Sequence, residues 1–509
     1  MDILNNYALG FSVSFSPSNL LYCAIGCVLG TAVGVLPGLG SAATIALLLP
    51  VTYHLNSTGA IIMLAGIYYG ACYGGSTTSI LFKIPGESSS VITCLDGYQM
   101  ARKGRAGAAL GISAFGSFFA GTMAVVAIAA IAPMLVEWAL EFGPPEYFSL
   151  LILGLTFVTF LGRGSPLKTL MMVAVGFVLG MVGIDPVRAV PRFAYGIPTL
   201  MSGFDLTLLA MGMFGISEVL TLIERPIRMD QVIEAPKGFL SLLPNRKEWK
   251  NSTMPILRGS ILGFLVGVLP GGGATIASFL SYGVEKKISK HPERFGDGAI
   301  EGVAGPESAN NSASTGAFVP LLTLGIPSNG VIALLLGAIM LHGITPGPLL
   351  LKTRPDMFWG LVTSMYIGNV MLLILNLPLI GMWTKLVFVP SSIMSPIITF
   401  ICLLGAYSVN NNPFDILIIV AMGMFGYLCN KLDFPVAPLL LAFILSLRIE
   451  QTFRQSLILS QGSFGIFFSR PISAVILVIV ILLYLLPMMR FLLQRFSRRY
   501  YNLKMAERR

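Results

Sequence analysis

The sequence predicts an all-α polytopic membrane protein, and three features point to this fold class. Of the 509 residues, 55% are hydrophobic and only 11% are charged, whereas about 25% are charged in an average soluble domain. Charged residues are absent from long blocks, including 3–82, 106–136, 308–351 and 471–489. The net charge of +10 comes largely from 490–509, which holds seven basic residues and one acidic residue. Such a tail is typical of a cytoplasmic flank and needs no nucleic-acid partner.

Two copies of one glycine-proline motif divide the chain. The segment GVLPGLG at 34–40 recurs as GVLPGGG at 267–273, and Ala-Thr-Ile-Ala follows both copies. A stretch rich in Ser and Thr comes next in each copy, followed by an Ile-Pro pair at 84–85 and at 326–327. Proline and glycine interrupt helices. Each copy therefore predicts a helix broken at membrane depth, where irregular backbone must be buried in protein or line a cavity.

Charge placement predicts that the two copies have opposite orientations. The connection after the first motif is uncharged, whereas the connection after the second contains four basic residues. The basic flank of the first copy instead follows its Ile-Pro pair, at 102–105. Since Lys and Arg favour cytoplasmic loops, these exchanged flanks predict inverted repeats, with re-entrant hairpins at 20–55 and 259–283.

The remaining apolar runs complete the predicted topology of about 11–12 transmembrane helices, each of about 20 residues. Four runs precede a charged loop, at 106–136, 147–162, 169–184 and 193–217, and about five follow Asp356. The chain then divides into a first membrane repeat with its following helices at 1–223, a charged cytoplasmic loop at 224–258, a second membrane repeat with its following helices at 259–489, and the basic cytoplasmic tail at 490–509.

The motifs of enzymes and ATP-driven pumps are missing. The nearest approach to a phosphate-binding loop has Leu167 in place of the glycine that must precede the lysine. The three histidines form no HExxH motif, and no GxSxG nucleophile elbow occurs. The six cysteines are scattered without a CxxC pair, so they predict neither a metal site nor a disulfide framework. We therefore expect no enzymatic activity and no resident cofactor.

Small polar side chains beside broken helices are the candidates for function. A half-helix that begins after Gly40 or Gly273 would present unpaired backbone N–H groups, which hold a carboxylate without a formal cation. The alternative is that these polar side chains only hydrogen-bond neighbouring helices. The predicted substrate-binding residues are Gly38, Gly40, Ser41, Ser76, Thr77, Thr78, Pro85 and Gly86 in the first copy and Gly272, Gly273, Asn310, Asn311, Ser312, Pro327, Ser328 and Asn329 in the second.

Three acidic residues are candidates for coupling to a cation. Asp205 lies between uncharged runs, and a carboxylate inside a membrane is a functional candidate by default. A position at a helix end is the alternative for Asp205. Glu87 and Glu307 lie beside prolines, where they would bind a cation or cap the start of a helix.

At these motifs the sequence resembles the large membrane subunit of the tripartite tricarboxylate transporters, the TctA family. The matching segments begin GVLPGLGSAATI, YGGSTTSILFKIPGE, GVLPGGGATIASF and LTLGIPSNG, and they cover 34–50, 73–111, 267–316 and 322–339. The similarity in length and segment order extends over essentially the whole chain. It implies a multi-pass secondary transporter of the bacterial inner membrane, driven by Na⁺ or H⁺. It also implies two partners, a small TctB-like membrane subunit and a periplasmic TctC-like solute-binding protein that delivers a small di- or tricarboxylate such as citrate.

The sequence departs from the family pattern in a few places. Lys83 stands where Asn is common, Ser41 where Pro often follows Gly-Leu-Gly, and Ser328-Asn329 where Gly-Ser often follows the second Ile-Pro pair. Lys83 would pair with an anionic substrate or extend to the membrane interface. These departures leave the identity of the carboxylate open. The sequence also leaves open whether the chain forms a homo-oligomer.

The residues and the resemblance together predict cation-coupled uptake of a small carboxylate between the two broken elements. A passive anion channel that uses the same re-entrant elements as a filter is the alternative. A membrane scaffold without transport is a third class, and it would tolerate substitution at the Gly-Pro breaks.

Overall fold

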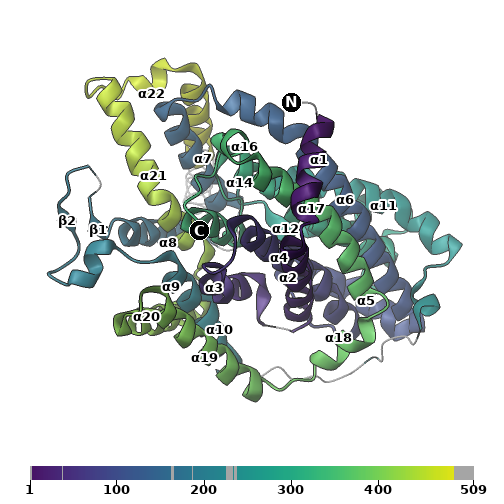
Figure 1. The fold of residues 1–509 in the computed structure, drawn as a ribbon. Helices are drawn as coiled ribbons and strands as arrows, with labels where there is room; N and C mark the ends of the chain where they lie inside the picture. The colour runs from purple at the N-terminus through teal and green to yellow at the C-terminus, as the bar shows by residue number, and fades with distance from the viewer. Residues whose placement is uncertain are drawn as a thin grey trace, which may run out of the picture.

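The computed structural model describes residues 3–36, 38–161, 165–185, 187–224, 233 and 238–485. Among these residues the chain is almost entirely helical, and its only sheet is a two-stranded ribbon (Figure 1). The predicted tail at 490–509 lies outside the described residues.

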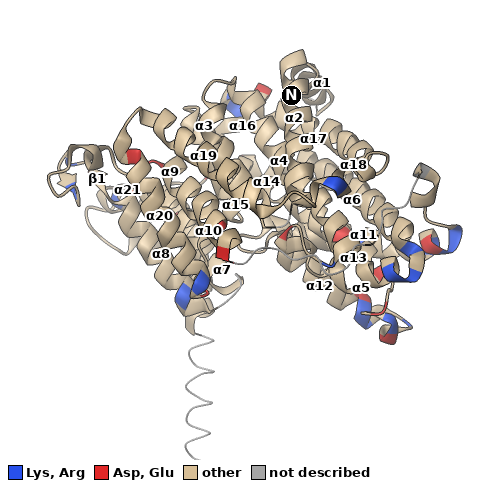
Figure 2. Cartoon of the chain, turned by 90° about the horizontal axis from the view of Figure 1, so that it is seen from below, with Lys and Arg blue, Asp and Glu red and all other residues tan. Residues whose placement is uncertain are grey.

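Seven helical segments in the described ranges are long and apolar enough to cross a bilayer. They are Pro17–Val35, Thr93–Ala139, Pro144–Leu161, Leu206–Glu224, Pro355–Asn376, Ser391–Asn410 and Pro413–Lys431. The shorter apolar helices are Gly40–Thr52, Pro166–Gly180, Gly330–Leu341 and Pro471–Leu485. In Figure 2 most of the ribbon is tan, and the charged residues form small, scattered groups. The all-α polytopic fold class is thus confirmed, while the total of about 11–12 transmembrane helices stays a prediction.

The first motif forms a helix, a break and two further helices. Helix α2 (Pro17–Val35) ends before the break, α3 (Gly40–Thr52) begins after it, and α4 (Ser57–Phe82) runs back beside α2. Asn56 begins α4 by accepting a hydrogen bond from the backbone N–H of Gly59. Lys83, in the left-handed conformation with φ 58°, ends the helix.

The second motif forms the same series. Helix α11 (Arg246–Val268) precedes the break, α12 (Gly273–Ile288) follows it, and α13 (Glu301–Gly316) with α14 (Phe318–Leu324) runs back beside α11. Gly325, with φ 69°, ends α14, and α15 (Gly330–Leu341) begins after the Ile-Pro pair. Helix α11 begins inside the predicted loop 224–258, because Asn245 and Glu248 form a reciprocal capping box there.

Glycines spaced four residues apart hold the long helices of each unit in backbone contact. In the first unit, Gly26, Gly30 and Gly34 of α2 face the backbone of Met63, Ile67 and Ala71 on α4. In the second, Gly259, Gly263 and Gly267 of α11 face Gly305, Ala309 and Ala313 on α13. A Cβ atom at either Gly34 or Gly267 would lie 2.3 Å from the facing carbonyl oxygen. This is the close approach that small residues allow between membrane helices.

The two breaks also share their backbone conformation. Gly38 and Gly271 have φ values of 93° and 81°, and Gly40 and Gly273 have values of 58° and 61°, a region that glycine enters without strain. The sequence repeat is therefore also a repeat of local structure. The opposite orientation of the copies, and their re-entry into the bilayer, stay predictions.

The other elements surround these two units. Between the units lie η1 (Ser88–Ser90), α5 (Thr93–Met100), the π-turn η2 (Ala101–Arg105), α6 (Ala106–Ala139), α7 (Pro144–Leu161), α8 (Pro166–Gly180), α9 (Leu206–Ala210), the π-turn η4 (Met211–Ile216), α10 (Ser217–Glu224) and η5 (Phe239–Leu242). Within the second unit, η6 (Pro292–Arg294) lies between α12 and α13. Outside the two units lie α1 (Ile3–Ser14), α16 (Leu349–Thr353), α17 (Pro355–Asn376), α18 (Ile380–Leu386), α19 (Ser391–Asn410), α20 (Pro413–Lys431), α21 (Ala437–Leu459) and α22 (Ile466–Ser469). Helix α6 packs against α13 and α17, whereas α21 packs against α7 and α8.

The predicted apolar run 193–217 is helical only in its second half. The first half belongs to a hairpin segment with β1 (Gly183–Ile184), β2 (Pro191–Arg192) and η3 (Pro198–Ser202). Gly196 and Gly203 have positive φ angles, which an α-helix does not contain. A prediction from hydrophobicity alone is therefore wrong for this half of the segment.

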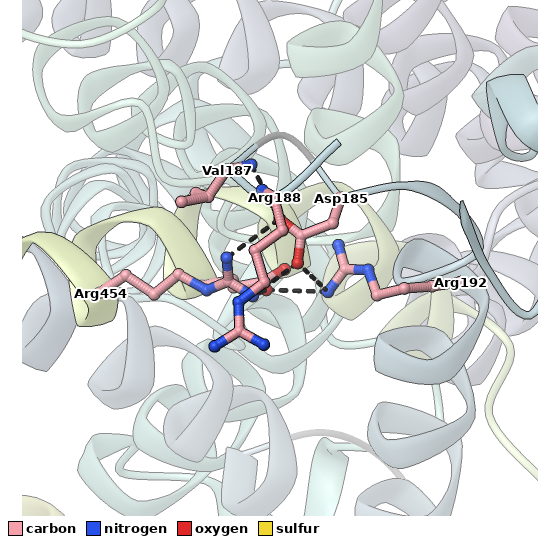
Figure 3. Close-up of polar contacts among 6 residues, drawn as sticks. Asp185, Val187, Arg188, Arg192 and Arg454 are labelled. Carbon is pink, nitrogen blue, oxygen red and sulfur yellow. Dashed lines mark hydrogen bonds and ion pairs between the residues drawn. The ribbon is translucent and has the colours of Figure 1, made fainter. Parts of the chain in front are cut away.

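An ion network fastens this hairpin segment to α21. The Asp185 carboxylate accepts hydrogen bonds from Arg454 at 3.0 and 2.8 Å and from the backbone N–H of Val187 at 2.8 Å. Arg192 lies 3.8 Å from the same carboxylate and 2.8 Å from Glu450. Figure 3 shows the two guanidinium groups reaching Asp185 from different sides. The Arg454 guanidinium holds the pKa of the Asp185 carboxyl well below its usual range.

Replacing Gly263 with Ala tests the glycine contact. Because the new Cβ would lie 2.3 Å from the Ala309 carbonyl oxygen, we expect a loss of about 1–3 kcal/mol of stability. Gly283→Ala is the control, since no atom lies within 4 Å of a Cβ there, and Ala in an open helical position is worth about 0.5–1 kcal/mol. The unfolding temperature of each detergent-purified variant gives the result, and equal stability of the two variants would contradict the close packing.

Replacing Asp185 with Asn should release the hairpin segment, with faster hydrogen exchange at 183–203 and unchanged exchange in α2 and α4. The depressed pKa of Asp185 means that its carboxylate contributes stability above the usual Asp pKa of about 3.9. That contribution is lost only as the pH falls through the lower, folded-state value. Wild-type protection should therefore be equal at pH 7 and about pH 5. Mass spectrometry measures the exchange, with Asp297→Asn, an exposed ion-pair partner of Lys103, as control. Unchanged exchange after Asp185→Asn would show that the network does not hold the segment.

Candidate functional site

A cavity of about 320 Å³ lies between the two broken elements. The first copy lines it with Ser41 at the start of α3, Tyr68 and Cys72 on α4, and Glu87 after the Ile-Pro pair. The second copy contributes 271–276 and 328–331. The structure thus brings together five of the predicted substrate-binding residues, which are Ser41, Gly272, Gly273, Ser328 and Asn329, with the cation-coupling candidate Glu87.

Helices outside the two copies close the cavity with mostly apolar side chains. Val158 comes from α7, Phe214 from η4, and Pro438 and Leu441 from α21. None of the described residues that line the cavity is Lys or Arg. Lys83 is exposed and lies over the Tyr98 ring at 5.8 Å, outside this lining. Any anion in the cavity must therefore be held by neutral donors.

The N-terminus of α12 supplies such donors. No described residue accepts a hydrogen bond from the backbone N–H groups of Gly273, Ala274 or Thr275. The first N–H groups of a helix have no partner within the helix and carry a partial positive charge. Since Gly273, Ala274 and Thr275 all line the cavity, this helix end faces the site with unpaired donors.

The N-terminus of α3 is instead occupied by a carboxylate of the chain itself. The backbone N–H of Ser41 donates a 2.5 Å hydrogen bond to Glu87 Oε1. The Ser41 hydroxyl and the backbone of Ser88 also hydrogen-bond this carboxylate. Of the two interpretations made from the sequence, capping a helix start is thus the one that this geometry displays for Glu87.

The loop after the second Ile-Pro pair faces the N-terminus of α12. The Ser328 carbonyl accepts a 2.7 Å hydrogen bond from the backbone N–H of Gly271. The Asn329 side chain caps α15 by accepting from Ile332 at 3.0 Å and donates to the Tyr68 hydroxyl at 3.1 Å. The Ser328 hydroxyl is fully buried and has no hydrogen-bond partner among the described residues. A buried hydroxyl without a partner marks a place for a further group.

A second polar cluster surrounds Glu307, one helical turn from the cavity. The Ser76 hydroxyl donates to Glu307 Oε2 at 2.5 Å, and the hydroxyls of Thr93 and Ser113 also reach this carboxylate. Ser76 follows the cavity residue Cys72 by one turn of α4 and hydrogen-bonds its carbonyl. Glu307 is completely buried, and these three partners are neutral.

The side-chain amides of two neighbouring asparagines differ in their hydrogen-bond partners. Asn311 donates to the Ser117 hydroxyl at 2.7 Å and to the Glu307 carbonyl at 3.1 Å. Asn310 is completely buried, and among the described residues neither its amide nitrogen nor its amide oxygen has a hydrogen-bond partner. Residues 307 and 310 are spaced so that they share one face of α13, so the Asn310 side chain leaves the helix on the same side as Glu307.

The remaining predicted residues lie outside the cavity lining. Ser312 donates to the Ser260 carbonyl at 2.6 Å, and Thr78 donates to the Gly75 carbonyl at 3.2 Å, so both bond backbone. A Cβ at Gly86 would lie 1.8 Å from the Gly34 carbonyl oxygen, so glycine is required there for packing. The others, which shape the breaks or are buried on α4, are Gly38, Gly40, Thr77, Pro85 and Pro327.

Asp205 caps a helix and lies in a different cavity. Its Oδ1 accepts a 2.6 Å hydrogen bond from the backbone N–H of Thr207 at the start of α9. It lines a cavity of about 490 Å³ together with Arg192 and Arg448. Of the two interpretations of Asp205, this geometry favours the helix end.

Sequence reasoning missed several residues of the site. Thr275 lies within the Ala-Thr-Ile-Ala segment that follows both motifs, so the repeat itself could have identified it. Tyr68, Phe214 and Leu441 carry no such signal, because their place in the lining depends on how distant helices pack.

Comparisons with known proteins agree with the architecture. A family model described as the tripartite tricarboxylate transporter TctA family matches residues 20–441. The chain is 48% identical over 493 residues to an Agrobacterium vitis protein named "Uncharacterized 52.8 kDa protein in TAR-I ttuC' 3'region", and the match covers 96% of this chain and 98% of that protein. A second protein of that organism, "Uncharacterized protein in TAR-II ttuC' 3'region", is 50% identical over 231 residues, which is 45% of this chain and 96% of its own length. No solved structure matches the chain. The family match, which extends over most of the sequence, shows that this chain belongs to the tripartite tricarboxylate transporter TctA family.

Proposed function

We propose that this chain is the large membrane subunit of a tripartite secondary transporter, which takes up a small di- or tricarboxylate such as citrate by coupling it to Na⁺ or H⁺. Membership of the TctA family, which is a family of transporters, supports the role of a transporter subunit. The observation that carries the finer proposal is the cavity between the two breaks, with unpaired N–H groups of α12 on one side.

The lining of this cavity suits a compact carboxylate. Backbone N–H groups and hydroxyls bind carboxylate oxygens, while the apolar side chains of Phe214 and Leu441 suit a carbon skeleton. A transporter must also release its substrate, and neutral donors bind an anion less tightly than a fixed cation would. The absence of Lys and Arg from the described lining therefore agrees with a site that releases its substrate in each transport cycle.

Glu307 is the best candidate for the coupling group. An isolated buried carboxylate costs several kcal/mol unless it is neutralised, and the identified partners of Glu307 are hydroxyls. A proton on Glu307, or a sodium ion held by Glu307 with the unpaired Asn310 oxygen, would neutralise it. Ser76 hydrogen-bonds both Glu307 and the carbonyl of the cavity residue Cys72, one turn earlier on α4. Binding of a proton or a sodium ion at Glu307 would therefore act on the cavity through Ser76.

The proposal includes the partners and location typical of a tripartite system. A small TctB-like membrane subunit and a periplasmic TctC-like binding protein would complete the transporter in the bacterial inner membrane. The binding protein would deliver the carboxylate, and no resident cofactor is required beyond the coupling ion.

Uptake into proteoliposomes tests the proposed function. Vesicles hold this chain with its small membrane subunit and binding protein, and an imposed Na⁺ or H⁺ gradient without ATP drives uptake of radiolabelled citrate or another di- or tricarboxylate. We expect accumulation above equilibrium that collapses when the gradient is dissipated. Equilibration without accumulation would identify a passive channel instead, and no flux with any tested acid would contradict transport.

Replacing Glu307 with Gln should separate coupling from substrate binding. The amide imitates a protonated carboxyl, so we expect gradient-driven accumulation to fall by about tenfold or more, as for loss of a functional intramembrane carboxylate. Exchange of internal for external substrate should persist if H⁺ is the coupling ion and fail if Na⁺ is. Glu137→Gln, at an exposed position of α6, is the control. Normal accumulation in Glu307→Gln would remove Glu307 from the coupling mechanism.

A further inference from the structure

We infer that the N-terminus of α12 binds a carboxylate of the substrate in the way that the N-terminus of α3 binds the carboxylate of Glu87, and that Asn329 keeps the α12 site open. The inference rests on the proposed function and specifies which half of the cavity recognises the anion.

Glu87 and Asn329 occupy equivalent positions in the two copies. Each lies three residues after the isoleucine of its Ile-Pro pair, and each approaches the glycine that begins the half-helix after the Gly-Pro break of its own copy. A Cβ at Gly40 would lie 3.9 Å from Glu87 Oε1, and a Cβ at Gly273 would lie 3.8 Å from Asn329 Cβ. The repeat therefore brings the same loop to the same helix end twice, with a carboxylate in one copy and a neutral amide in the other.

This exchange leaves one helix end hydrogen-bonded to a carboxylate of the chain and the other without one. In the first copy, the Ser41 N–H donates to Glu87 at 2.5 Å. In the second, Asn329 turns its oxygen to Ile332 and its nitrogen to Tyr68, so it contributes no anion to α12. The N–H groups of Gly273, Ala274 and Thr275 have no acceptor among the described residues. The Glu87 carboxylate thus displays, within the same chain, the ligand that such a helix end accepts.

A second observation points to a ligand at the open end. The Ser328 hydroxyl, completely buried and without a hydrogen-bond partner in the described part of the chain, lines the same cavity directly before Asn329. Ser328 is also anchored to the break, because its carbonyl accepts from Gly271 at 2.7 Å. Its hydroxyl can donate to one oxygen of a carboxylate whose other oxygen accepts from the start of α12.

The asymmetry also orients the substrate. An anion in the cavity is attracted by the partial positive charge of α12 and repelled by the Glu87 carboxylate when that group is ionised. One carboxylate of the substrate therefore lies at Gly273–Thr275, and the remainder of the molecule extends along the apolar wall formed by α7 and α21.

Substitution of Asn329 with Asp tests the inference. Asp keeps the cap on α15, since Asn and Asp cap helices about equally well, but it places a negative charge beside the open helix end. We expect the affinity for citrate, or for whichever di- or tricarboxylate the wild-type protein binds, to fall by about tenfold or more. Asn329→Ser keeps a capping group without adding charge, so it should weaken binding less than Asn329→Asp does. Glu137→Gln, at an exposed position of α6, is the control and should stay within about threefold of wild type. Equilibrium binding of the radiolabelled acid to the full-length detergent-purified chain measures these affinities.

Ser328→Ala supplies an independent variant. Because the hydroxyl has no partner among the residues that the structure describes, its removal should leave the unfolding temperature unchanged while weakening binding by about three- to tenfold. Wild-type affinity in both Asn329→Asp and Ser328→Ala would overturn the inference and leave the proposed function standing. Failure of the wild-type chain to bind any of the acids would overturn both.

Discussion

Close backbone contact between paired helices is the constraint on which the rest of the structure depends. Helix α2 lies against α4, and α11 lies against α13, through glycines that recur every fourth residue. Any side chain at these positions would collide with a carbonyl, so the pairs can form only with glycine. This contact fixes the position of each break beside the partner helix. The helices α3 and α12 begin directly after these breaks. A cavity of fixed shape between two interrupted helices requires such rigid support.

The function that we propose depends on the difference between the two copies as much as on their likeness. Their backbones take the same conformation at the breaks and at the ends of α4 and α14. Their side chains differ where it matters for charge, with Glu87 against α3 and Asn329 facing α12. A duplicated framework thus presents two helix ends to one cavity, one of them already neutralised. Ser76 hydrogen-bonds both Glu307 and the carbonyl of the cavity residue Cys72, and we propose that a cation at Glu307 acts on the cavity through this contact.

Much of the fold could be predicted from the sequence because its strongest signals are local. The repeated Gly-Pro motif located both breaks, and charge-free blocks located the long helices. The first half of 193–217 was misjudged because it is apolar without forming an α-helix. The hairpin segment to which it belongs is held by an ion pair between Asp185 and Arg454, which are far apart in the sequence. The start of α11 was missed because hydrophobicity does not register a capping box. Helix boundaries that depend on such specific hydrogen bonds cannot be predicted from amino-acid composition.

The candidate site could be predicted only in part. Residues beside the breaks were found, and Ser41, Gly272, Gly273, Ser328 and Asn329 do line one cavity. Residues with a side-chain hydroxyl, such as Thr78 and Ser312, were also predicted to bind substrate, although their hydroxyls donate to backbone carbonyls. Composition cannot separate these two roles, because the same hydroxyl serves a helix or a ligand according to what lies opposite. The capping of α3 by Glu87 needed three-dimensional placement of a loop 46 residues away.

The central claim is that a carboxylate occupies the cavity between the breaks, held by the start of α12. A cryo-electron microscopy structure of the full chain with its small membrane subunit, determined with and without saturating citrate or another acid that binds, tests this most directly. The account predicts added density within hydrogen-bond distance of the Gly273–Thr275 N–H groups and the Ser328 hydroxyl. Density elsewhere, such as beside Arg448 in the cavity that contains Asp205, would contradict it.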